Sequence, residues 1–161
     1  MVIVLFGVAG AGKTTVGRSL ARHLGWSFYD GVRFHSPASI EKMWAGISLT
    51  DADRAPWIES IRALIQRCVE APENAVVACS ALREAYRQRL QINDSVRFVF
   101  LKADFETLKR RLEQRHGHFA GPALLQSQFD TLEPPEQDAL VIDATGPPDG
   151  IVQRIRKEFG V

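Results

Sequence analysis

The stretch GVAGAGKT at residues 7–14 constrains the fold of this chain more than any other part of its sequence. It matches the phosphate-loop pattern G-x-x-x-x-G-K-[ST] in full. The apolar run VIVLF at residues 2–6 precedes it, and a helical pattern with Val16, Leu20 and Leu24 on one stripe follows it. A strand that leads through a glycine loop into a helix is the context in which this pattern binds phosphate. The sequence therefore predicts a nucleotide-binding α/β domain.

Each position of the loop has a predicted role. Lys13 is expected to reach the β- and γ-phosphates of the nucleotide, and Thr14 is expected to hold Mg²⁺. No N-K-x-D motif that reads guanine occurs in the sequence, which favours a kinase over a GTPase. The predicted nucleotide-binding residues of the loop are Gly7, Val8, Ala9, Gly10, Ala11, Gly12, Lys13, Thr14 and Thr15.

Apolar runs alternate with helical patterns along the rest of the chain. Such repeated strand–helix units predict a parallel sheet that is covered by helices on both faces. A length of 161 residues with 45% hydrophobic content fits one domain with a single sizeable core. The predicted later strands are 27–29, 75–79, 96–101 and 139–142, and the predicted later helices are 36–46, 49–69, 83–92, 104–115, 122–130 and a last one at the C-terminal end.

Composition argues against several kinds of partner. The formal net charge is +1 and no run of lysine and arginine stands out, so nucleic acid is not expected. No segment is long enough to span a membrane, and the apolar start leads straight into a glycine loop, which indicates a strand and not a signal peptide. The two cysteines, Cys68 and Cys79, lie in apolar segments, which is typical of a reducing compartment. A cytoplasmic location is expected.

Five further segments follow the phosphate loop: FYDGVRFH (28–35), IEKMWAGISLTDADRAPW (40–57), CSALREAYRQRL (79–90), RLEQRHGHF (111–119) and LLQSQFDTLEPP (124–135). In this order they resemble the signatures of the gluconokinase family, small P-loop kinases related to shikimate kinase. The resemblance implies phosphorylation of D-gluconate at its 6-hydroxyl by ATP with Mg²⁺. It also implies a P-loop kinase fold with a five-stranded sheet in the order 2-3-1-4-5 and a short lid, and it suggests a homodimer.

The lid is expected at residues 111–125 of a single domain that spans 1–161. Arg111 and Arg115 are four residues apart, so they are predicted to share one helix face. In kinases of this kind such arginines close over the phosphates and offset the charge that develops during transfer. Arg111 is therefore also predicted to bind the nucleotide. A solvated basic helix is the alternative, because Lys109 and Arg110 are adjacent.

The acceptor is expected to bind along the segment 30–57. A polyol with a carboxylate needs a cation and several hydrogen-bonding groups, and the guanidinium of Arg54 can grip a carboxylate with two parallel bonds. The alternative for Arg54 is an exposed helix residue in an i,i+4 pair. His35 lies just past a predicted strand end, where open α/β sheets place ligands. With the resemblance, the predicted substrate-binding residues are His35, Lys42, Arg54, Ser80, Ala81, Arg83 and His118.

One departure from the family pattern concerns the catalytic base. The resembling kinases carry D-x-D at the end of the second strand, with the first carboxylate near Mg²⁺ and the second near the acceptor hydroxyl. Here the first is Asp30 and the second position is Val32, which cannot accept a proton. Three interpretations stay open: Asp30 serves both roles, the chain is a kinase of another small sugar acid, or it is a catalytically weakened nucleotide-binding or regulatory protein. The predicted catalytic residues are Lys13, Asp30, Arg111 and Arg115, with Thr14 and Asp30 at the metal.

Overall fold

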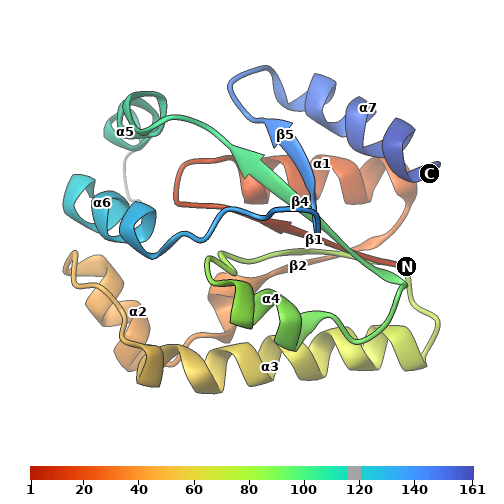
Figure 1. Cartoon of the computed structure of the whole chain (residues 1–161), viewed down its shortest axis with the longest axis horizontal. Helices are drawn as coiled ribbons and strands as arrows, with labels where there is room; N and C mark the ends of the chain where they lie inside the picture. Colours follow the sequence, from red (N-terminus) through yellow and green to blue (C-terminus); the bar gives the residue numbers. More distant parts are fainter. Residues whose placement is uncertain (116–120) are drawn as a thin grey trace.

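The computed structural model of the chain describes residues 1–115 and 121–161. Within these ranges five strands form one parallel sheet in the order β2-β3-β1-β4-β5, as predicted (Figure 1). The strands are β1 (Val2–Phe6), β2 (Ser27–Asp30), β3 (Ala75–Ala78), β4 (Val96–Lys102) and β5 (Leu140–Asp143).

Helices cover both faces of the sheet, which confirms the predicted layers. Figure 1 shows α3 and α4 on one side of the sheet and α1 and α7 on the other. The helices of the described residues are α1 (Lys13–Leu24), the 3₁₀ helix η1 (Gly31–Phe34), α2 (Pro37–Trp44), α3 (Asp51–Glu70), α4 (Glu84–Leu90), α5 (Phe105–Glu113), α6 (Pro122–Thr131) and α7 (Pro148–Phe159).

Strand β1 is the centre of the core, and its five residues are fully buried. Alternate side chains of a strand point to opposite faces of a sheet. Ile3 and Leu5 accordingly pack with residues of α1, α5, α6 and α7. Val2, Val4 and Phe6 pack with residues of α3 and α4. The run VIVLF is apolar throughout because both faces of this strand are covered.

The helix ends follow local chemistry. Gly25 closes α1 in the left-handed conformation with φ 68°, which glycine adopts without a steric penalty. Thr50 begins α3 through a capping box, in which its hydroxyl accepts from the Asp53 amide and the Asp53 carboxylate accepts from the Thr50 amide. Both ends were expected from the sequence.

Two helix assignments differ from the expectation. The 3₁₀ helix η1 was not predicted; it forms because the Asp30 carboxylate caps it by accepting from the Val32 amide. The helix expected at 104–115 ends at Glu113, and the Arg115 amide turns back to the Leu112 carbonyl in the tighter pattern common in last helical turns. The prediction that Arg115 lies on the helix is therefore wrong.

The carboxyl ends of three neighbouring strands meet at one edge of the sheet. Asp30 in β2 and Leu5 in β1 both pair with Ala78 in β3, so the segments that follow these strands start at the same level. Gly31 lies so close to β3 that a Cβ atom there would be 2.7 Å from the Ala78 carbonyl oxygen. Only glycine permits this approach, which holds the end of β2 against the end of β3.

Candidate active site

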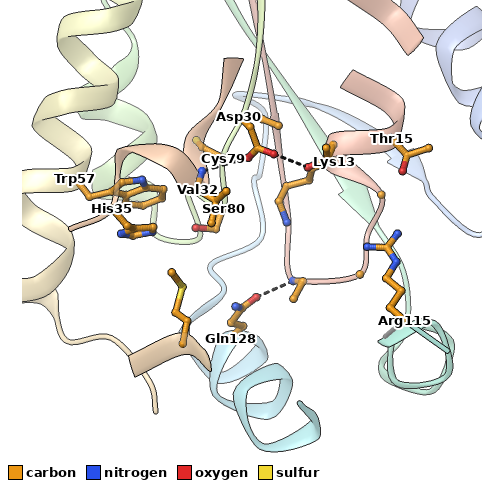
Figure 2. A pocket seen from close by; sticks show the side chains of 16 residues that line it. Lys13, Thr15, Asp30, Val32, His35, Trp57, Cys79, Ser80, Arg115 and Gln128 are labelled. Carbon is orange, nitrogen blue, oxygen red and sulfur yellow. Dashed lines mark hydrogen bonds between the residues drawn. The ribbon is translucent and has the colours of Figure 1, made fainter. Parts of the chain in front are cut away.

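A cavity of about 360 Å³ opens at this edge of the sheet (Figure 2). The phosphate loop, the segments after β2 and β3, and side chains from several helices form its walls. Its lining residues are Ala9, Gly10, Gly12, Lys13, Thr14, Thr15, Asp30, Val32, His35, Met43, Trp57, Ala78, Cys79, Ser80, Arg115 and Gln128.

The phosphate loop is folded around its own lysine. Lys13 Nζ donates to the carbonyl oxygens of Gly7 and Val8, each at 2.9 Å. Burial lowers the pKa of Lys13 to about 8, and the nearby Cys79 and Asp30 oppose this effect. A phosphate beside the ammonium would favour its charged form, because an opposite charge at short range does so. The loop thus holds a cation ready for an anionic group.

Not every predicted loop position faces the cavity. The side chains of Val8 and Ala11 are buried in the core beneath the loop. Backbone amides and carbonyls are the groups that these residues offer to a ligand. The Gly7 amide donates to the Ser80 carbonyl at 3.3 Å, which ties the loop to the segment after β3.

Thr14 and Asp30 form an oxygen-rich corner beside the loop. Thr14 Oγ1 donates to Asp30 Oδ2 at 3.1 Å, and Asp30 Oδ1 accepts from the Val32 amide at 3.2 Å. Magnesium in kinases is held by one or two protein oxygens together with substrate phosphates and water. A hydroxyl and a carboxylate at this spacing fit such an ion, and the binding of Mg²⁺ by Thr14 and Asp30 stays a prediction.

The other end of the cavity is less polar. The His35 ring stacks on the Trp57 indole with 4.3 Å between ring centroids and 12° between planes. Trp57 Nε1 donates to the Gly31 carbonyl at 2.7 Å, which fixes this stack against the end of β2. Val32 lies beside the pair in Figure 2. The stack forms a flat wall of the cavity.

His35 is neutral near pH 7 in this environment. Burial lowers its pKa to about 4, and the positive charge of Arg54 adds to the effect. Its Nδ1 atom is buried and has no hydrogen-bond partner among the described residues. A neutral imidazole with an unpaired nitrogen can exchange a hydrogen bond with a hydroxyl group. His35 lines the cavity, and its contact with the acceptor stays a prediction.

A group of charged side chains gathers around Asp51, outside the residues that line the cavity. The Tyr86 hydroxyl donates to Asp51 Oδ1 at 2.6 Å, and Arg83 Nε and Arg54 Nη1 lie 3.3 and 3.6 Å from the same oxygen. The Arg54 side chain is only 13% exposed, so it is not the exposed helix residue of the alternative interpretation. It lies close enough to His35 to influence its pKa.

The remaining predicted acceptor residues have mixed positions. Ser80 lines the cavity, whereas Ala81 lies next to it outside the lining, with an unusual φ of 38°. Lys42 pairs with Asp53 at 2.9 Å, away from the cavity lining. His118 lies outside the described residues.

The two predicted lid arginines have different surroundings. Arg111, in α5, donates to the carbonyl oxygens of Gly10 at 3.3 Å and Ala144 at 2.6 Å, so it contacts the phosphate loop from outside the cavity lining. Arg115 lines the cavity, and Figure 2 shows it on the side of the phosphate loop. Of the segment predicted as a lid, residues 111–113 end α5 and residues 122–125 begin α6.

Comparison with known proteins decides the family. A family model described as an AAA domain matches residues 3–122. The chain is 42% identical over 160 residues to the gluconokinase of Gluconobacter oxydans (strain 621H), a match that covers 98% of this chain and 90% of that protein. The chain belongs to the gluconokinase family.

Solved structures agree with membership in the gluconokinase family. The structure of an unliganded sugar kinase from Janibacter sp. HTCC2649 matches 99% of this chain and 94% of its own, with a TM-score of 0.92 and 37% identity. A gluconokinase from Sinorhizobium meliloti 1021 matches 98% of this chain and 94% of its own, with a TM-score of 0.83 and 38% identity. The family and the P-loop kinase fold inferred from the sequence are thus confirmed.

Among the described residues of this member of the gluconokinase family, none of the helices combines the length and the apolar character that crossing a bilayer requires.

Several residues that line the cavity were not among the predicted site residues. Trp57 matched the apolar stripe of α3 and was assigned to the core, yet it also lines the cavity. Gln128 follows Leu125 by three residues and the buried Leu124 by four, so it lies on the inward face of α6. A polar residue at an inward position of a helix was the sequence feature that could have identified Gln128 as a site residue.

Arg87 supports the site from within the protein. Its side chain is 1% exposed, and its guanidinium lies over the Phe6 ring at 4.8 Å. It joins the segment after β3 to the segment after α6. Its hydrogen-bond acceptors are the carbonyls of Ala81, Leu82 and Glu133 and the carboxylate of Asp138, at 3.1, 3.2, 2.9 and 3.3 Å.

Arg87→Ala is expected to lower the free energy of unfolding of this gluconokinase-family chain by about 3 kcal/mol or more. The substitution leaves buried carbonyls unpaired and removes one partner of an ion pair. Urea unfolding followed by circular dichroism measures the change. Arg89→Ala is the matched control: Arg89 pairs with Glu59 at 2.7 Å, but both side chains are more than half exposed, so a loss of about 1 kcal/mol or less is expected. Equal losses in the two variants would contradict the supporting role of Arg87.

Proposed function

We propose that this chain transfers the γ-phosphoryl group of ATP to the 6-hydroxyl of D-gluconate, forming 6-phospho-D-gluconate and ADP. The observation that carries the proposal is that one cavity joins the phosphate loop to the His35–Trp57 stack. A nucleotide on the loop and an acceptor on the stack would therefore share one cavity. The identity of the acceptor is inferred from the gluconokinase relatives, and the phosphate loop is the proposed binding site of the phosphoryl donor.

In the proposed reaction the acceptor oxygen bonds to the γ-phosphorus while the bond from this phosphorus to the β–γ bridging oxygen breaks. The proton of the hydroxyl passes to Asp30, and ADP leaves with the bridging oxygen. Lys13 and Arg115 line the cavity, and their proposed role is to offset the negative charge of the transferring group. Phosphoryl transfer depends mainly on such positioning and charge stabilisation. Thr14 and Asp30 would hold Mg²⁺ together with the phosphates, and the ion would supply further neutralisation of charge.

Asp30 is the base of this proposal because it is the carboxylate among the residues that line the described cavity. A loose transition state places little demand on the base, since the acceptor proton is lost late. The high identity with gluconokinases over nearly the whole chain favours an active kinase over a weakened binding protein.

The decisive experiment measures ADP release from Mg·ATP by the purified chain with D-gluconate and with a panel of other sugar acids and polyols. Gluconate is expected to give the highest kcat/KM. If only another sugar acid is turned over, the proposed acceptor is wrong but the assignment as a kinase holds. Absence of acceptor-dependent ADP release throughout the panel would overturn the proposal.

Arg54→Lys is expected to raise the KM for gluconate roughly tenfold and to leave the KM for ATP nearly unchanged. Lysine keeps the charge but loses the planar fork that binds a carboxylate with two parallel bonds. Arg54 is largely buried and lies near His35, at the acceptor end of the site. Steady-state kinetics with each substrate varied in turn measures the two constants. Equal changes in both would place Arg54 in a supporting role around Asp51.

A cytoplasmic location and a homodimer stay predictions from the sequence and the family resemblance.

A further inference from the structure

Gln128 links α6 to the phosphate loop across 119 residues of sequence. Its Oε1 atom accepts a hydrogen bond from the Ala9 amide at 2.7 Å, drawn as a dashed line in Figure 2. Ala9 and Gln128 both line the cavity. One backbone amide of the loop is thus paired with a side chain of α6.

This bond fixes which way the Gln128 amide points. A backbone N–H can only donate, so the atom that faces Ala9 must be the carbonyl oxygen and not the amide nitrogen. The Nε2 group, with two donor hydrogens, is then directed away from the loop. No hydrogen-bond partner of Nε2 occurs among the described residues. In Figure 2 the nitrogen lies on the side of Gln128 that faces away from the dashed bond, toward the half of the cavity that holds His35.

Helix α6 is anchored firmly enough to keep this donor in place. Leu124 and Leu125 are buried in the core, one turn before Gln128. Beside Gln128, the Ser127 hydroxyl accepts from the Ser48 hydroxyl at 2.6 Å, which connects α6 to the segment between α2 and α3. Adjacent residues of α6 therefore contact the phosphate loop and the acceptor segment.

We propose that Gln128 is a further substrate-positioning residue, whose Nε2 group donates a hydrogen bond to a hydroxyl oxygen of the acceptor next to the phosphate loop. This inference rests on the proposed kinase function and assigns one polar contact of its acceptor site. A polyol needs donors as well as acceptors along its length, and the His35–Trp57 wall offers few. Gln128 supplies a donor at the junction where the acceptor must meet the phosphoryl group.

Two substitutions separate a contact with the acceptor from mere support of the loop. Gln128→Glu keeps an oxygen for the Ala9 amide but replaces the donor group by a second, negatively charged oxygen. Gln128→Leu removes both functions. Gln126→Glu is the matched control, because Gln126 is exposed on the same helix and donates to Asp130 at 2.9 Å. It adds the same charge to α6 away from the cavity.

The experiment measures KM for gluconate, KM for ATP and kcat for the four proteins, with thermal unfolding as a check on folding. Gln128→Glu is expected to raise the KM for gluconate at least roughly tenfold, the scale of one lost hydrogen bond plus repulsion, and to change the KM for ATP less than about threefold. Gln128→Leu is expected to raise both constants, because the loop loses its partner as well. Gln126→Glu is expected to match the wild type.

Wild-type kinetics for Gln128→Glu would overturn the inference and leave Gln128 as a support of the loop. An equal rise in the KM for ATP and the KM for gluconate would indicate that the Nε2 group contacts the nucleotide, and this result would also overturn the inference. If the wild type prefers another sugar acid, the same comparison is made with that acceptor. If the wild type phosphorylates no acceptor, the proposed function fails, and calorimetry of gluconate binding to the protein with Mg·ADP tests the contact instead. Weaker binding of gluconate to Gln128→Glu than to Gln126→Glu would support the contact. Equal binding, or no binding, would refute it.

Discussion

Replacing Lys13 by alanine is expected to lower kcat for gluconate phosphorylation by about 10²–10³-fold. This is the typical effect of removing one preorganised group that stabilises charge in a transition state. Lys13 begins α1, lines the cavity and bonds to the Gly7 and Val8 carbonyls, so its ammonium lies where the phosphates would bind. Arg115 is the other cationic side chain of Lys or Arg among the residues that line the described cavity, so part of the charge stabilisation is expected to remain in the variant.

The same variant tests whether the effect is chemical and not structural. Circular dichroism and thermal unfolding should show a folded protein, because Lys13 is not part of the apolar core. Lys157→Ala, at an exposed position of α7, is the control for loss of a positive charge and should keep wild-type turnover. Wild-type kcat in a folded Lys13→Ala protein would refute the assigned role of the phosphate loop.

Asp30→Asn is expected to lower kcat by about 10²–10⁴-fold, the range that general-base assistance supplies. Asparagine retains an oxygen that can accept from the Val32 amide, so the cap of η1 can persist. It loses the charge, the ability to take a proton and an oxygen for the Thr14 hydroxyl. The KM for ATP at saturating Mg²⁺ should rise as well, because Asp30 is also assigned to the metal.

Val32→Asp measures whether a second carboxylate is missing. If Asp30 alone serves the acceptor, the substitution should leave kcat within a few-fold of the wild type. Arg33 follows directly and would lower the pKa of a new carboxyl, so Val32→Asp with Arg33→Asp belongs in the same series. A gain of 100-fold or more in either variant would contradict the view that Asp30 is sufficient, and would mean that the natural protein works without an effective base.

Local sequence determined the parts of the fold whose residues are close together in the chain. The phosphate loop, the start of α3 at Thr50 and the end of α1 at Gly25 depend on hydrogen bonds and backbone angles within a few residues, so pattern alone predicted them. The alternation of apolar runs and helical stripes gave the parallel sheet. The order of its strands came from the resemblance to gluconokinases, because strand order depends on which distant segments pair.

Only the tertiary structure decided which side chains share the cavity. Arg54 and Lys42 were predicted as acceptor ligands from type and position; the structure pairs them with Asp51 and Asp53 outside the cavity lining, and their contact with the acceptor stays a prediction. Such pairs depend on side-chain directions that a linear pattern does not contain.

The bond between Gln128 and Ala9 and the clamp of Arg87 on Glu133 join residues 119 and 46 positions apart. A backbone donor or acceptor gives no sign in the sequence of the distant side chain that will satisfy it. The sequence alone therefore determined the phosphate loop and its chemistry. The packing of α6 and of the segment after β3 against that loop determined the rest of the site, because burial requires each polar group to find a partner and only the folded geometry brings those partners together.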